Sequence, residues 1–141
     1  MRVVADTNVL VSALLWSGAP HRLLALAETS RIALYTSPAL IDELAGVLAR
    51  HHFTARLNVL RVADEELVAN YLKLAHLVLP IPIPPVIVAD PDDDAVLACA
   101  RAADAAYIVS GDPHLLSLKR YHAVHIVSPR TFLTDVLGIL H

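Results

Sequence analysis

The sequence predicts a single α/β domain, 1–141, with a central parallel sheet covered by helices on both faces. Short apolar runs typical of strands alternate along the chain with segments whose apolar residues recur at helical spacing. Parallel strands need crossover connections, and the crossover helices pack on both faces of the sheet. A length of 141 residues with 56% hydrophobic residues suits one domain with a substantial core and excludes a disordered chain.

Five elements are expected in the first third of the chain. The first apolar run stops at Asp6, and helical spacing follows it, so a buried strand leads into a helix. A break at 17–20 separates the next helix, and Ser37 followed by Pro38 suits the N-cap and first turn of a third. The expected elements are a strand over 3–5, helices over 9–14 and 21–29, a strand over 32–35 and a helix over 37–48.

The rest of the chain begins with a basic, irregular connection over 50–61. Acidic residues at 64–66 favour a helix N-terminus, and four prolines between 80 and 85 predict an extended linker before the apolar run Val86 to Val88. The expected elements are helices over 64–76 and 95–103, a strand over 107–109, a helix over 115–118, a strand over 125–127 and a helix over 129–137.

Composition excludes several classes of protein. Prolines interrupt the longest uncharged stretch, 74–89, so no membrane span is expected, and no signal peptide is recognised at the N-terminus. The one cysteine, Cys99, cannot form an internal disulfide, and no Cys/His zinc pattern is present. We therefore expect a soluble cytoplasmic protein without membrane contact.

Four acidic residues stand out: Asp6, Glu43, Asp94 and Asp112. Asp6 and Asp112 follow predicted strands, and ligand sites in parallel sheets collect beyond the carboxyl ends of the strands. Two carboxylates about 4 Å apart repel by roughly 4 kcal/mol at an effective dielectric of 20, so such a cluster requires a proton or a cation. Oxygen ligands suit Mg²⁺ or Mn²⁺, and a hydrated ion of this kind supports phosphodiester hydrolysis.

The net charge of −3 does not exclude a nucleic-acid substrate. If these four acids form a metal site, 10 acids remain against 11 bases. Each acid also has an ordinary structural interpretation, because Asp6, Asp112 and one of 92–94 suit helix caps and Glu43 suits a solvated helix face.

In combination, the segments VVADTNVLVSALL, SPALIDEL and DPDDDAVLACARAADAAYIVSGDPHLL resemble the motifs of the PIN-domain family of metal-dependent nucleases. The resemblance implies a three-layer α/β/α sandwich of Rossmann-like type with an acidic pocket. It implies four catalytic acids, Asp6, Glu43, Asp94 and Asp112, of which Asp6, Asp94 and Asp112 hold Mg²⁺ or Mn²⁺. Thr7, Asn8 and Ser110 are expected to support the carboxylates, and Asp93 and Asp92 are rivals for the third acidic position.

The resemblance further implies a metal-dependent endoribonuclease that is a VapC-like toxin of a type II toxin–antitoxin pair. The expected partners are RNA, a cognate antitoxin and a second copy of the chain in a homodimer. The alternative is a PIN-like nucleic-acid-binding or interaction module with negligible catalysis. A response-regulator-like domain is disfavoured because Asp6 is a single acid and the segment 110–112 contains no lysine. A HAD-like phosphatase is disfavoured because it would have a second aspartate two residues after the first, where this chain has Asn8.

Contacts to the substrate are harder to predict. Basic residues that could contact phosphate are Arg22, Arg50, Arg56, Arg61, Lys119 and Arg120, although each also suits an ordinary solvated surface. Few aromatic residues are present and several lie in apolar runs, so we expect no aromatic platform for single strands. Val59, Leu60 and the proline-rich segment are weak candidates for a dimer or antitoxin surface.

Overall fold

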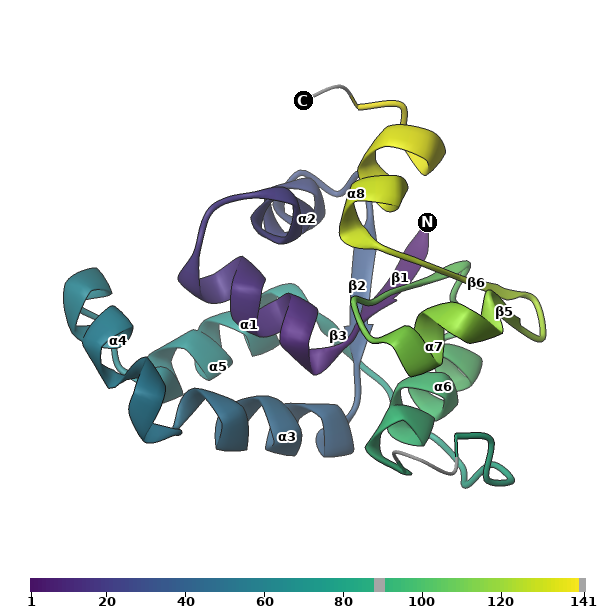
Figure 1. Cartoon of the computed structure of the whole chain (residues 1–141), viewed down its shortest axis with the longest axis horizontal. Helices are drawn as coiled ribbons and strands as arrows, with labels where there is room; N and C mark the ends of the chain where they lie inside the picture. Colours follow the sequence, from purple (N-terminus) through teal and green to yellow (C-terminus); the bar gives the residue numbers. More distant parts are fainter. Residues whose placement is uncertain (88–90, 140–141) are drawn as a thin grey trace.

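A computed structural model describes residues 1–87 and 91–139 of the chain. Over these residues the fold is an α/β sandwich around one mostly parallel sheet, as the sequence predicts (Figure 1). The strand order is β3-β2-β1-β4-β6-β5, and only the pair β5 and β6 is antiparallel. The strands are β1 Arg2–Ala5, β2 Ala33–Thr36, β3 His76–Leu77, β4 Tyr107–Val109, β5 Arg120–Tyr121 and β6 Val124–Val127.

Helices follow most strands, as parallel connections require. They are α1 Thr7–Leu15, α2 Ala19–Glu28, α3 Pro38–Leu48, α4 Thr54–Leu60, α5 Asp64–Leu74, α6 Pro91–Ala103, α7 Pro113–Leu118 and α8 Pro129–Thr131. A 3₁₀ turn, His51–Phe53, precedes α4, and a π-helical turn, Phe132–Val136, follows α8.

No single helix among the described residues is long and apolar enough to cross a membrane. Helices α1 and α2 reach the required length and apolar composition only together, across an 85° bend.

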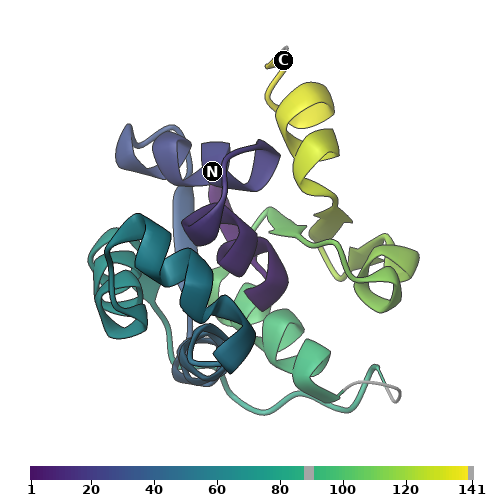
Figure 2. The same cartoon turned by 60° about the vertical axis from the view of Figure 1, so that its left-hand side comes forward.

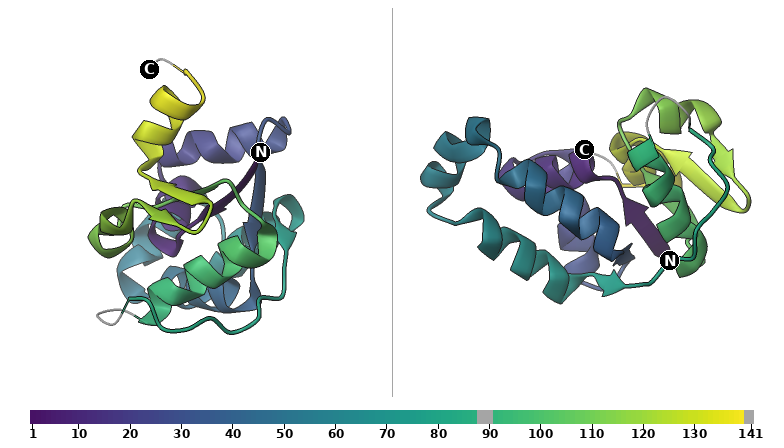
Figure 3. Two further views of the ribbon diagram at one scale, coloured as in Figure 1. Left: turned by 90° about the vertical axis from the view of Figure 1, so that its right-hand side faces the viewer. Right: turned by 90° about the horizontal axis from the view of Figure 1, so that it is seen from below.

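Alternation of side chains along β1 creates the two apolar layers. Val3 and Ala5 point into one core with α1, α2, α3, α5 and the C-terminal turns, whereas Val4 points into the other with α6 and α7. Figure 3 shows these groups of helices on opposite sides of the sheet. Helix α1 lies between α2 and α3 in both Figure 1 and Figure 2. Because both faces are covered, β1 is almost entirely buried, as expected for a central parallel strand.

Some local predictions were wrong. The connection predicted to be irregular contains the 3₁₀ turn and α4, although α4 has no side-chain cap and begins directly after Phe53. The two-residue edge strands β3 and β5 were not expected, and β3 begins at His76, where a helix was predicted to end. Val88, at the end of the predicted apolar run, lies outside the described residues.

The register of the sheet brings two functional loops together. Ala5 of β1 is paired with Val109 of β4, and the Asp6 backbone N–H donates to the Val109 carbonyl at 3.1 Å. The next residues, Asp6 and Ser110, therefore leave the sheet side by side at its carboxyl edge.

Candidate metal centre

Acidic residues from four separate elements line one small pocket at the carboxyl edge of the sheet. The cavity is about 40 Å³, room for an ion and not for a nucleotide. Asp6 follows β1, Glu43 lies on α3, Asp93 is in the first turn of α6, and Asp112 follows β4. The full lining is Asp6, Thr7, Asn8, Glu43, Asp93, Val96 and Asp112.

Asp6 occupies the floor of the pocket and is only 5% exposed. Its Oδ1 accepts a hydrogen bond from the Val9 backbone N–H at 2.8 Å, so it caps α1. Its Oδ2 accepts a hydrogen bond from the hydroxyl of Ser110. Ser110 Oγ in turn accepts from the Asp112 backbone N–H at 2.9 Å. The helix cap and the pocket position predicted for Asp6 therefore coexist, and Ser110 links the two acidic loops.

Burial destabilises the ionised form of Asp6. Desolvation raises the pKa of the Asp6 carboxyl above its ordinary value of 3.8, and the nearby charge of Asp112 raises it further. Hydrogen bonds from Ser110, Val9 and Gly111 lower the pKa but do not cancel the effect of burial. A cation in the pocket would reverse this balance, because an opposite charge at short range favours the carboxylate.

Asp93, Asp112 and His114 form the tightest group of metal-ligating side chains among the described residues. One ligand atom from each lies within 4.8 Å of the others, across the first turns of α6 and α7. Asp112 also caps α7, since its Oδ1 accepts from the His114 backbone N–H at 2.7 Å. Sequence reasoning missed His114; the only available signal was its position two residues after an acid at a strand end.

Asp94 lies outside this pocket. Its carboxylate accepts hydrogen bonds from the Ile87 backbone N–H at 2.9 Å and from the Val86 N–H at 3.2 and 3.3 Å. Successive helical residues are rotated by about 100°, so Asp93 and Asp94 face different directions. The structure thus places Asp93, named in the sequence analysis as a rival, where Asp94 was expected, and gives Asp94 the task of anchoring the preceding segment.

The predicted supporting residues differ in their contacts. Ser110 contacts Asp6 as described, whereas the buried Thr7 Oγ1 has no hydrogen-bond partner among the described residues. Asn8 is exposed at the pocket lining, and Glu43 is half-buried there. Among the described residues that line the pocket, none is one of the six basic residues considered for phosphate contact.

This set of side chains fits a divalent cation. Oxygen donors predominate, and Asp6 is buried at a cost that a cation would offset. Thr7 also lines the pocket, and its buried hydroxyl has no hydrogen-bond partner among the described residues. Cys99 supplies no alternative nucleophile, because burial raises the pKa of its thiol to about 12.

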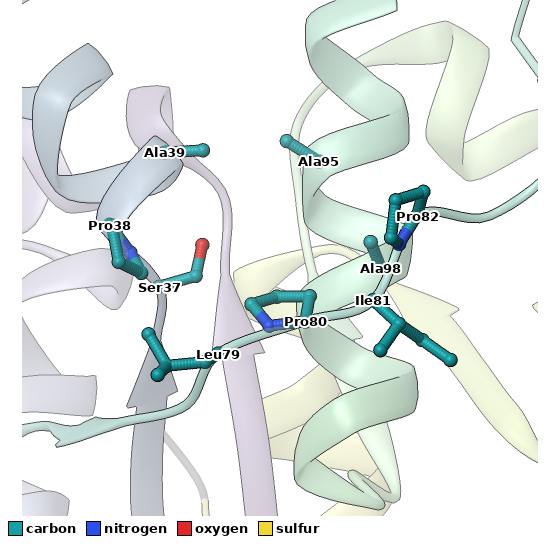
Figure 4. A pocket seen from close by; sticks show the side chains of 9 residues that line it. All are labelled: Ser37, Pro38, Ala39, Leu79, Pro80, Ile81, Pro82, Ala95 and Ala98. Carbon is teal, nitrogen blue, oxygen red and sulfur yellow. The ribbon is translucent and has the colours of Figure 1, made fainter.

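A larger cavity of about 380 Å³ lies between the start of α3 and the other face of α6 (Figure 4). Ala39 and Ala95 face each other across it, and the segment Leu79 to Pro82 crosses its edge. Its lining is mostly apolar and contains no carboxylate among the described residues. This cavity is therefore not a candidate for the metal centre.

Comparison with protein families agrees with this geometry. The sequence model of the PIN domain matches residues 2–114, which include every residue that lines the acidic pocket. PIN domains are generally nucleases that use a divalent metal. No curated protein matches the chain.

The raised pKa of Asp6 predicts a pH effect on stability in the absence of metal. Asp6 binds a proton more tightly in the folded state than in the unfolded state, so protonation of Asp6 stabilises the fold. This contribution to the unfolding free energy is complete below about pH 4 and is lost as pH rises through the folded pKa. Relative to Asp6→Asn, the chelated wild-type protein should lose unfolding free energy with rising pH in urea titrations. Asn keeps an Oδ1 acceptor for the Val9 N–H, so the cap survives. A pH-independent difference between the two proteins would contradict the interpretation.

Asp93 and Asp94 should have separable roles. We expect Asp93→Asn to weaken Mn²⁺ binding by more than about tenfold in calorimetric titration while the unfolding free energy changes little. Asp94→Ala should instead leave Mn²⁺ affinity nearly unchanged and reduce the unfolding free energy by about 1–3 kcal/mol, because two backbone N–H groups lose a charged acceptor. Loss of Mn²⁺ binding in Asp94→Ala, with binding kept in Asp93→Asn, would reverse the assignment.

Proposed function

This chain belongs to the PIN domain family, and from that premise we propose that it is a metal-dependent endoribonuclease. The observation that carries the proposal is the convergence of Asp6, Glu43, Asp93 and Asp112 on one small pocket. Four carboxylates so placed repel one another unless a proton or cation is present.

The proposed metal ligands are Asp6, Asp93 and Asp112, with Glu43 contributing directly or through water. A divalent ion bound there lowers the pKa of a coordinated water and stabilises charge on a phosphodiester. Ser110 and the Val9 N–H fix the orientation of Asp6, and the His114 N–H does the same for Asp112. Glu43, half-buried on α3, lines the pocket and is suited to accept a proton from water.

The proposed cofactor is Mg²⁺ or Mn²⁺. Carboxylate oxygens suit both ions, but the imidazole of His114 lies within reach of Asp93 and Asp112. Mn²⁺ accepts a nitrogen ligand more readily than Mg²⁺, which follows from the order of affinities for divalent metals and the hard character of Mg²⁺. The position of His114 therefore favours Mn²⁺.

The proposed biological role is that of a VapC-like toxin, with an antitoxin and a second copy of the chain as protein partners. Exposed apolar side chains near the edge strand β3 support a protein partner on that side, since Leu77, Leu79 and Ile81 are 55–79% exposed. The cavity of Figure 4 adjoins Leu79 and Ile81 and would be covered by the same partner.

The competing proposal is a PIN-like nucleic-acid-binding or interaction module with negligible catalysis. It shares the pocket and the metal but not turnover. The presence of Glu43 in the pocket beside the three proposed metal ligands favours the nuclease, because a carboxylate that accepts a proton from water is needed for turnover and not for metal binding alone.

Purified protein should cleave end-labelled single-stranded RNA with Mn²⁺ or Mg²⁺ and not in EDTA. Asp112→Asn and Glu43→Gln should each reduce the rate by more than about tenfold, because each removes a charged group from the pocket. Asp42→Asn is the matched control, since Asp42 is the neighbour of Glu43 on α3 but is exposed outside the pocket, and its rate should equal that of the wild type.

Cleavage that persists in Asp112→Asn would exclude this pocket as the active site. Retained binding of Mn²⁺ and RNA without any cleavage by the wild type would favour the binding module.

A further inference from the structure

A second cluster of functional side chains lies at the far end of α1, where it was not expected from the sequence. The indole of Trp16 meets the ring of Phe53 edge to face, with centroids 6.1 Å apart. The Arg56 guanidinium carbon lies 5.7 Å from the Trp16 ring centroid, and Arg56 Nε donates to the Leu15 carbonyl at 2.7 Å. His52 extends the cluster, with its ring centroid 4.0 Å from that of Phe53.

This cluster is accessible and cationic. Trp16 is 44% exposed, an unusual position for the one tryptophan of the chain. The hollow beside it, about 170 Å³, is lined by His21 and Arg56 and by no acid among the described residues. A separate hollow is lined by Arg50, by Asp64 at the acidic start of α5, and by Thr54, Leu57 and Asn58 of α4.

Helix α1 connects this cluster to the acidic pocket. Asn8 and Ser12 of α1 are exposed or half-exposed and lie four residues apart on one face, and Trp16, the C-cap residue four positions further on, donates its backbone N–H to the Ser12 carbonyl. Asn8 lines the pocket, and Trp16 lies about 12 Å further along the helix axis. Figures 1 and 3 show α4 at the end of the molecule away from α6 and α7.

We propose that Trp16, Phe53 and Arg56 form a second RNA-binding site, at which an unpaired base of the bound strand stacks on Trp16. This proposal rests on the proposed function, because it places the rest of the substrate relative to the pocket. A single strand whose scissile phosphate lies in the pocket follows the exposed face of α1 towards Trp16. Indole faces bind bases of any identity, and Arg56 supplies positive charge for the backbone.

Charge distinguishes RNA from a protein partner as the occupant. Between residues 44 and 63 the chain carries three arginines and two histidines and no acidic residue. The arginines complement a polyanion, and the hollow beside Trp16 is lined by Arg56 and by no acid among the described residues, so two copies that met there would bring like charges together. Val59 and Leu60 add exposed apolar area nearby, so self-association is the competing outcome that the experiment must detect.

The single tryptophan makes the site directly observable. Asp6→Asn protein is titrated in Mg²⁺ with single-stranded RNA of two or of eight nucleotides, and the fluorescence of Trp16 is recorded. This background prevents cleavage, so the binding result is independent of whether the wild-type protein is a nuclease. We expect the eight-nucleotide RNA to quench the fluorescence of Trp16. The two-nucleotide RNA is too short to reach Trp16 from the pocket, so at the same occupancy of the pocket it should not change the fluorescence.

Affinity is measured in parallel from the anisotropy of labelled eight-nucleotide RNA. Trp16→Leu and Arg56→Ala should each weaken binding about tenfold, the scale of one stacked base. Trp16→Phe should recover part of that loss. Arg31→Ala is the charge control. Arg31 is exposed just before β2, at the amino ends of the parallel strands, whereas the acidic pocket lies at their carboxyl ends. Its loss should change affinity less than twofold. Thermal unfolding of each variant detects any loss of fold, since Arg56 also anchors α4 to Leu15.

Equal affinity of Asp6→Asn protein with and without Trp16→Leu, when both are folded, would overturn the proposal. RNA binding that does not quench Trp16 would overturn it as well. So would a Trp16 spectrum that shifts with protein concentration and not with RNA, which would show that a second copy covers this surface. Cleavage by the wild-type protein together with either result would leave the proposed function intact.

Discussion

The burial of the Asp6 carboxylate at the end of the central strand constrains everything around it. β1 is paired on both sides and covered on both faces, and Asp6, directly after it, is only 5% exposed. A buried carboxylate is costly unless hydrogen bonds and opposite charge offset the lost hydration. The N-terminus of α1 and the hydroxyl of Ser110 supply the hydrogen bonds, and the clustering of further carboxylates creates the demand for a cation. The helix cap, the Ser110 hydrogen bond and the proposed metal centre thus all meet at Asp6, which the fold buries at the end of its central strand.

The layers of the fold and the positions of Asp6 and Asp112 can be predicted from the sequence, because they depend on local pattern. The alternation of strands and helices gave the layers, and an acid that follows an apolar strand has a defined place at the carboxyl edge of a parallel sheet. Asp6 and Asp112 satisfy that condition, and Ser37 with Pro38 determines where α3 begins and hence the depth of Glu43.

The remainder depends on tertiary contacts that local pattern does not encode. Asp92, Asp93 and Asp94 are chemically alike, and only the direction of α6 against the pocket selects Asp93, while Asp94 faces the backbone of Val86 and Ile87. Edge strands of two residues have too short a pattern to detect. Trp16 and Phe53 are far apart in sequence, and the 3₁₀ turn before α4 brings Phe53 against Trp16. The expectation of no aromatic platform rested on composition, which does not encode this contact.

We propose that the carboxylates after β1 and β4 and the one in the first turn of α6 form one divalent-ion site. Anomalous diffraction from crystals soaked in Mn²⁺ locates the ion without reference to activity. We expect a single strong peak within coordinating distance, about 2.0–2.3 Å, of carboxylate oxygens of Asp93 and Asp112 and close to Asp6. A peak coordinated by Asp94, or no peak in the pocket at saturating Mn²⁺, would contradict it.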